Sequence, residues 1–235
     1  MKLLDGKVAI VTGGGRGIGA AIAMEFAKNG AKVVLAGRVP AELEETAKKI
    51  KAAGGEALAA HADVTKLKDI RDMLGKTSKA FGKIDILVNN AGVLLDYGPF
   101  ADMKDENMQK TVDVNLLGTM HCTKEAIPYL KKNRSGLIIN ISSVAGKSGY
   151  PNLAVYSATK FGIIGFTESL AQELEKDRIA VYAICPTGTQ TKMFEQISTA
   201  KAEHVPEDVA LEIMDLIKNM KKIPTGKAID VGKHV

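Results

Sequence analysis

The stretch that decides the fold is VAIVTGGGRGIG, residues Val8 to Gly19. Its first four residues are apolar, a run of glycines follows, and after it apolar residues recur every fourth position, as on one face of a helix. Glycines let the backbone turn tightly and approach a pyrophosphate, whose charge then lies at a helix N-terminus. With a strand before it and a helix after it, the pattern Gly15-x-Gly17-x-x-Ala20 predicts a dinucleotide-binding loop rather than a merely flexible turn.

The same alternation of short apolar runs and helical periods continues along the chain. Further strands are expected at residues 32–36, 57–60, 84–88, 137–141, 179–184 and near 227–231, and helices at 41–53, 67–81, 105–132 and 156–176. Almost uninterrupted apolar strands between helices indicate a parallel sheet that helices cover on both faces. We therefore expect an α/β fold, a Rossmann-type doubly wound, mainly parallel seven-stranded sheet. Because no linker or repeat interrupts the pattern, residues 1–235 are expected to form one domain, with a short substrate-loop region at about 193–206.

Composition argues against several function classes. The chain has 235 residues and a formal charge of +5, but its lysines are spread along the predicted helices and tryptophan is absent, which does not favour a nucleic-acid surface. No apolar run is long enough for a membrane span, and the N-terminus lacks a secretory signal. Cys122 and Cys185 lie in apolar segments, as expected of reduced core residues. The four histidines are His61, His121, His204 and His234; they form no cluster, so no metal site is expected. These features predict a cytoplasmic protein.

A second informative stretch is NISSVAGKSGYPNLAVYSATK, from Asn140 to Lys160. Tyr156 and Lys160 are four residues apart, so on a helix they lie on the same face. A lysine ammonium beside a tyrosine favours the phenolate and is expected to lower the tyrosine pKa from its usual value of about 10. Ser143 follows an apolar run that predicts a strand, so all three side chains should meet at the carboxyl edge of the sheet.

Each of these signals alone has an ordinary explanation, since a Tyr-x-x-x-Lys pair is usually a surface pair and Ser-Ser after a strand is usually a turn. Together they resemble the short-chain dehydrogenase/reductases, in their compact single-domain branch close to 3-oxoacyl-acyl-carrier-protein reductases and related carbonyl reductases. The resemblance covers Lys7 to about Met193. It implies that Ser143, Tyr156 and Lys160 are catalytic. It also implies that Asn115, 41 residues before Tyr156, holds a water that links the lysine to solvent. From the residues alone, an Asn inside a helix could simply fix a local bend.

The resemblance also implies which residues bind the cofactor. The spelling Thr12-Gly-x-x-x-Gly-x-Gly matches the family's own glycine loop, Asp63 and Val64 would contact the adenine, and Thr191 would contact the nicotinamide carboxamide. Asp63 could equally cap the next helix. The expected cofactor contacts are Gly13, Gly15, Arg16, Gly17, Ile18, Gly19, Arg38, Asp63, Val64, Asn90, Ala91, Gly92, Tyr156, Lys160, Pro186, Thr189 and Thr191. The Asn89-Asn90-Ala91-Gly92 motif is partly a stability element in the family, and Thr187 stands where the family usually has glycine.

Cofactor preference is expected to be for NADP (NADPH). NAD-binding folds place an acidic residue at the end of the second strand, about 20 residues after the glycine loop. Here the strand ends Ala36-Gly37-Arg38, with no carboxylate before Glu42. Arg38 can offer its planar guanidinium to a 2′-phosphate, and Arg16 can approach the same group from the glycine loop. The alternative is that Arg38 is a solvated turn residue and Arg16 only starts a helix.

These observations predict an NADP-dependent oxidoreductase that reduces a ketone or aldehyde to an alcohol, or runs the reverse, with Tyr156 as general acid/base. Two alternatives stay open: a non-catalytic NADP-binding regulatory protein, expected to lack Tyr156 or Lys160, and a nucleotide-sugar epimerase, expected to have a longer C-terminal domain. The substrate is a small carbonyl or alcohol compound. Apolar residues cover more than one stripe of the helices expected at 105–132 and 156–176, so a homodimer or homotetramer is also expected.

Overall fold

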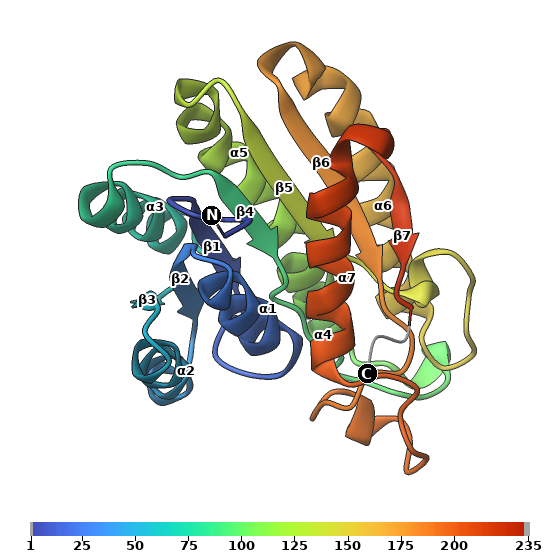
Figure 1. The fold of residues 1–235 in the computed structure, drawn as a ribbon. Coiled ribbons are helices and arrows are strands. Elements are labelled where there is room, and N and C mark those ends of the chain that lie inside the picture. Colours follow the sequence, from blue (N-terminus) through green and yellow to red (C-terminus); the bar gives the residue numbers. More distant parts are fainter. Residues whose placement is uncertain (1, 233–235) are drawn as a thin grey trace.

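The computed structural model describes residues 2–232, and in it strands and helices alternate along the chain (Figure 1). The strands are β1 (Val8–Thr12), β2 (Lys32–Gly37), β3 (Glu56–His61), β4 (Ile86–Asn89), β5 (Gly136–Ile141), β6 (Ile179–Cys185) and β7 (Ala228–Asp230). The α-helices are α1 (Gly17–Lys28), α2 (Pro40–Ala52), α3 (Leu67–Phe81), α4 (Asp105–Val112), α5 (Gly118–Lys132), α6 (Ala154–Leu174) and α7 (Pro206–Asn219).

The strands of the described residues form one sheet with the order β3-β2-β1-β4-β5-β6-β7. Every neighbouring pair is parallel, so the sheet is entirely parallel, whereas the sequence predicted a mainly parallel one. The strand order reverses at β1, which pairs with β2 on one side and with β4 on the other. In such sheets, ligands bind outside the carboxyl ends of the strands at the point of reversal. The predicted Rossmann-type, doubly wound fold is confirmed.

Helices cover both faces of this sheet, and each face has its own apolar core. Phe26 of α1, Leu43 of α2 and Ile213 of α7 belong to one cluster. Leu74 of α3 and Leu130 of α5 belong to the other, together with the buried C-terminal half of α6. Figure 1 shows α1 and α7 side by side on the near face and α5 and α6 behind the sheet. The continuous apolar strands of the sequence are explained by this two-sided burial.

The structure corrects one predicted element. The single helix expected over residues 105–132 is interrupted by a π-helical turn, Asp113–Leu117, between α4 and α5. Asn115, in this turn, uses its side chain to bond the backbone of Val93, and Gly118 lies so close to Val64 that an added Cβ would be 2.7 Å from a Val64 methyl carbon. Contacts from outside the helix therefore define the break. Among residues 2–232, none of the helices is both long enough and apolar enough to cross a membrane.

Candidate active site

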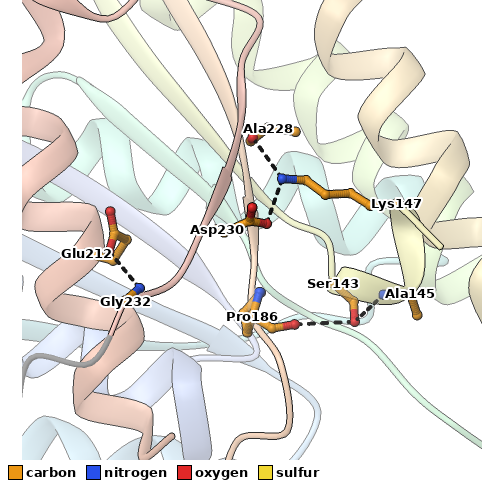
Figure 2. Close-up of polar contacts among 8 residues, drawn as sticks. All are labelled: Ser143, Ala145, Lys147, Pro186, Glu212, Ala228, Asp230 and Gly232. Atoms are coloured by element: carbon orange, nitrogen blue, oxygen red, sulfur yellow. Dashed lines mark hydrogen bonds and ion pairs between the residues drawn. The ribbon is translucent and has the colours of Figure 1, made fainter. Parts of the chain in front are cut away.

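Ser143 lies two residues after the end of β5, at the carboxyl edge of the sheet. Its backbone is extended, and its hydroxyl accepts a hydrogen bond from the Ala145 amide at 3.1 Å, which starts the short 3₁₀ turn Val144–Gly146. The same hydroxyl lies 3.5 Å from the Pro186 carbonyl oxygen, a long contact to the end of β6 (Figure 2). The serine is thus held between two strand ends, with its hydroxyl in the cleft outside the sheet.

The turn that follows Ser143 is fixed to α6 and to β7. Ser142 donates its hydroxyl to the Lys160 carbonyl oxygen at 2.9 Å, and Gly146 packs so tightly on α6 that an added Cβ would be 2.6 Å from that oxygen. On the other side, Lys147 Nζ lies 2.6 Å from a carboxylate oxygen of Asp230 and donates to the Ala228 carbonyl oxygen at 3.2 Å (Figure 2). The close-up also shows the Gly232 amide donating to Glu212 at 3.0 Å. These contacts secure the edge strand beside the Ser143 turn.

Tyr156 and Lys160 lie one turn apart near the start of α6, as the sequence predicted. The Lys160 Nζ is 5.5 Å from the centre of the Tyr156 ring and donates a hydrogen bond to the Ile141 carbonyl oxygen at 2.8 Å. Lys160 is only 5% exposed, so its amine is removed from bulk water. The end of β5 therefore anchors the lysine, and the lysine lies against the tyrosine.

The protonation of this pair differs from the expectation. Burial raises the pKa of Tyr156 to about 12, although a hydrogen bond with Ser143 works in the opposite direction. Burial lowers the pKa of Lys160 to about 8, while the nearby Cys185 works to raise it. In the chain alone, desolvation of the phenolate has the largest effect on the Tyr156 pKa, and the hydrogen bond with Ser143 is the effect that opposes it. The predicted lowering of the tyrosine pKa by Lys160 is therefore not found in the chain by itself.

Asn115 lies behind the cleft and not in its wall. Its side chain accepts from the Val93 amide at 2.8 Å and donates to the Val93 carbonyl oxygen at 2.9 Å. A third, longer contact of 3.4 Å reaches the hydroxyl of Thr159, next to Lys160 in the sequence. The side-chain amide thus holds the loop after β4 in place, and the main-chain carbonyl oxygen of Asn115 accepts from the Thr119 hydroxyl at 2.9 Å.

The glycine loop closes over the end of β1 and requires glycine where the chain approaches itself. A Cβ at Gly19 would overlap the Gly13 carbonyl oxygen, and Gly13 has a φ of +65°. Asn90 clamps this loop, because its side chain donates to the carbonyl oxygens of Thr12 and Gly13 at 2.9 and 3.2 Å. Asn89 in turn donates to the Asn140 side chain at 2.8 Å, which ties β4 to β5.

These elements border a single cleft of about 1050 Å³ at the carboxyl edge of the sheet. Ser143 and every residue expected to contact the cofactor line it, from Gly13 at the glycine loop to Thr191 after β6. Thr191 reaches the glycine loop: a Cβ at Gly17 would lie 3.3 Å from its methyl group. The site therefore offers a glycine cradle, a polar cluster with a proton donor, and room for an elongated ligand. This arrangement fits a dinucleotide.

The loop after β6 carries Thr187 where the family usually has glycine. Thr187 lines the cleft, and its carbonyl oxygen accepts from the Thr189 hydroxyl at 3.1 Å. Thr191 accepts from the Phe194 amide at 3.2 Å and so starts the short turn Phe194–Gln196. Thr189 also pairs with His204 in an isolated parallel bridge, which joins the loop after β6 to the far end of the predicted substrate-loop region. His204 is 3% exposed, so this anchor is buried.

At the other end of the cleft, both predicted arginines are present, but each has a carboxylate nearby. Arg16 forms an ion pair with Glu42 at 3.3 Å. Burial works to raise the pKa of Asp63, but hydrogen bonds from Thr65 and the positive charges of Arg38 and Lys66 hold that pKa below its usual value. Sequence reasoning named Glu42 only as the first carboxylate after the second strand and did not place it beside Arg16, because it lies beyond the strand end where an acid is normally sought. Its place in the first turn of α2 was the available signal.

Comparison with known proteins agrees with this geometry. The sequence model of the short chain dehydrogenase family matches residues 7–202. A 3-oxoacyl-[acyl-carrier-protein] reductase from Synechocystis sp. is 41% identical over 199 residues, which cover 84% of this chain and 80% of that protein. A Thermotoga maritima protein described as an uncharacterized oxidoreductase is 38% identical over 219 residues, 93% of this chain and 85% of that protein.

A solved structure extends the similarity to the whole fold. The crystal structure of 3-ketoacyl-(acyl-carrier-protein) reductase from Brucella melitensis, complexed with NADH, matches with a TM-score of 0.89 and 35% sequence identity, covering 97% of both chains. The chain belongs to the short-chain dehydrogenase family of oxidoreductases.

Proposed function

We propose that this protein is an NADP-dependent reductase that converts a ketone or aldehyde to an alcohol, or catalyses the reverse reaction. The observation that carries the proposal is the meeting of Ser143, Tyr156 and Lys160 in one cleft with the glycine loop. A binding protein has no need for a tyrosine hydroxyl and a buried lysine amine at this place. A reductase needs both, because the product alkoxide must receive a proton.

The nicotinamide of NADPH supplies the hydride in this chemistry. The protein supplies the proton: Tyr156 donates its hydroxyl hydrogen to the substrate oxygen, and Ser143 holds that oxygen by a hydrogen bond. With a pKa of about 12, Tyr156 is protonated at neutral pH, which is the form that carbonyl reduction requires. Lys160, whose pKa is about 8, still carries its charge at pH 7 and stabilises the phenolate that forms.

Two further roles come from the family resemblance. Lys160 would also hold the hydroxyls of the nicotinamide ribose, and Asn115 would hold a water that links Lys160 to solvent. At the adenine end, Asp63 and Val64 would contact the base. Arg16 and Arg38 would bind the 2′-phosphate, and the absence of an acidic side chain at Gly37 supports NADP over NAD. We place the enzyme in the cytoplasm.

The relatives suggest which substrate to try first. Two of the proteins similar to this chain are named 3-oxoacyl- or 3-ketoacyl-(acyl-carrier-protein) reductases. A 3-oxoacyl thioester is therefore the first candidate, ahead of sugars, steroids and simple ketones. It would enter beside the loops at residues 93–100, 147–153 and 193–204, where Leu94, Tyr150 and Ile197 line the cleft.

The test is a panel of carbonyl compounds, with 3-oxoacyl thioesters included, in which oxidation of NADPH is followed for the purified protein. We expect reduction of at least one member of the panel and no reaction without a carbonyl substrate. An NADPH-binding protein that reduces no member, in either direction of the reaction, would contradict the proposal and favour a regulatory role.

A further inference from the structure

One ion pair lies inside the proposed 2′-phosphate site and has no part in the reaction. The Arg16 Nη1 atom lies 3.3 Å from the Glu42 Oε1 atom, and both residues line the cleft. The Arg16 side chain is 61% exposed whereas that of Glu42 is 30% exposed. The arginine is therefore the more solvent-accessible partner, and the carboxylate is the more confined one.

The backbone fixes the position of Glu42. It lies in the first turn of α2, and the glycine loop packs directly on that turn: a Cβ at Gly15 would be 3.0 Å from the Cβ of Glu42. One turn farther on, Thr46 donates its hydroxyl to the Gly15 carbonyl oxygen at 2.9 Å. The backbone and Cβ of Glu42 therefore cannot move away from the glycine loop without moving α2, so its carboxylate stays close to the loop, while the more exposed Arg16 side chain can leave it by rotating.

The charges around this end of the cleft nearly balance. Arg16 faces Glu42, and the charge of Arg38 acts on Asp63, so each cation has an acidic neighbour. Glu45 and Lys49 also line the cleft, and they form their own ion pair at 2.7 Å. A 2′-phosphate that enters here meets two guanidinium groups but also the negative charge of Glu42, which repels it.

We propose that Glu42 competes with the 2′-phosphate of NADP for Arg16 and thereby limits how strongly the enzyme discriminates NADP from NAD. This inference rests on the proposed NADP dependence. Binding of NADP requires Arg16 to exchange the Glu42 carboxylate for the phosphate, whereas NAD, which lacks the phosphate, requires no exchange. Removal of the carboxylate should therefore strengthen the binding of NADP and leave the binding of NAD nearly unchanged.

The test uses two probes that need no carbonyl substrate: adenosine 2′,5′-bisphosphate and adenosine 5′-monophosphate, whose affinities are measured by calorimetry. Glu42→Gln should bind the bisphosphate about three- to tenfold more tightly than the wild type, and the monophosphate equally well. The gain should shrink as salt is added, since the pair is solvent-exposed. Glu44→Gln is the matched control, because it removes the same charge from the same helix, but from an exposed residue that does not line the cleft.

Arg16→Met separates the failure of this inference from the failure of the proposed function. If the wild type prefers the bisphosphate, Arg16→Met loses that preference, and Glu42→Gln behaves like Glu44→Gln, then NADP dependence holds and competition by Glu42 is wrong. Weaker bisphosphate binding by Glu42→Gln also overturns the inference, because Glu42 would then orient Arg16 for the phosphate. If neither the wild type nor Glu42→Gln prefers the bisphosphate, both the NADP assignment and the inference are wrong.

Discussion

At the scale of single residues, the burial of Lys160 makes the stability of the protein depend on pH. In the unfolded chain a lysine keeps its proton up to about pH 10.5, whereas in the fold Lys160 releases it near pH 8. Between these values the unfolded state binds more protons, so folding stability rises with pH. Below pH 8 the buried ammonium carries its full desolvation cost.

This linkage predicts the behaviour of Lys160→Met, which keeps most of the side-chain volume but cannot be protonated. The free energy of unfolding of the wild type should rise relative to the variant between about pH 8 and pH 10.5, by up to about 1.4 kcal/mol per pH unit. Urea denaturation of both proteins across this range measures the difference. A difference that stays constant, or that falls as the pH rises, would show that Lys160 does not titrate as the geometry indicates.

A second residue-scale prediction concerns the end of β2. A Cβ at Gly37 would lie 3.3 Å from a methyl carbon of Leu43, so an aspartate needs only a small shift of that flexible side chain. Gly37→Asp combined with Arg38→Leu should move cofactor preference towards NADH by on the order of a few kcal/mol, because charged hydrogen bonds to the phosphate are lost and repulsion is added. The ratio of kcat/KM for NADPH and NADH reports this shift. A wild type that uses NADH as efficiently as NADPH would refute the assignment.

Sequence reasoning identified which side chains line the cleft but not their electrostatics. Spacing alone was sufficient to bring Ser143, Tyr156 and Lys160 together, because the carboxyl ends of parallel strands share one edge. The pKa of Tyr156 depends on how deeply the hydroxyl is buried, and the Arg16–Glu42 pair depends on how the glycine loop packs on α2. Both the burial of the hydroxyl and the packing of the loop arise from segments far apart in the sequence, so a local sequence pattern predicts neither.

At the scale of elements, the π-helical turn Asp113–Leu117 holds the loop after β4 through the hydrogen bonds between the Asn115 side chain and the Val93 backbone. Asn115→Ala should leave the amide and the carbonyl of Val93 without their partners, and should destabilise the fold by about 1–3 kcal/mol. It should also lower kcat, because that loop forms the wall of the cleft next to Lys160.

Asn133→Ala is the control for this variant. Asn133 donates to the Ile84 carbonyl oxygen at 2.7 Å, at the opposite end of the sheet from the cleft. It should lose stability but keep kcat. Thermal unfolding and steady-state rates of both variants measure the difference. If Asn115→Ala keeps the wild-type kcat, Asn115 has a structural role only.

The elements that the sequence predicted well are those with a strong local period. The helix over residues 67–81 is found with the same bounds, because its apolar residues keep helical spacing from end to end. The break inside 105–132 could not be predicted, since apolar periodicity continues through Leu116 and Leu117 while the cause, Val93, lies in another segment. Strand ends differ by one or two residues, as at β4, which begins at Ile86 and not at residue 84.

At the scale of the whole molecule, α6 and the turn before α5 leave large apolar side chains in solvent. Phe161 is 45% exposed and Leu117 is 37% exposed, and the side chain of Leu116 packs against Gly162. A helix that is apolar over a wider arc than the sheet can cover favours a second partner. We therefore predict a homodimer or homotetramer that uses this face.

Light scattering at micromolar concentration should give a multiple of the 25.0 kDa chain mass, and Phe161→Glu should move it towards the single-chain value. Thr46→Ser, a small change far from this face, should leave the mass as it is in the wild type. A wild-type mass near 25 kDa would contradict the prediction.

The central claim, that Tyr156 donates the proton in an NADPH-dependent carbonyl reduction, is tested most directly by Tyr156→Phe. The substitution removes only the hydroxyl. On whichever carbonyl compound the wild type reduces, kcat should fall by about 10²–10⁴-fold, while the Kd for NADPH, measured by fluorescence titration, stays nearly unchanged. A variant that keeps substantial turnover, with intact NADPH binding, would remove Tyr156 from the mechanism.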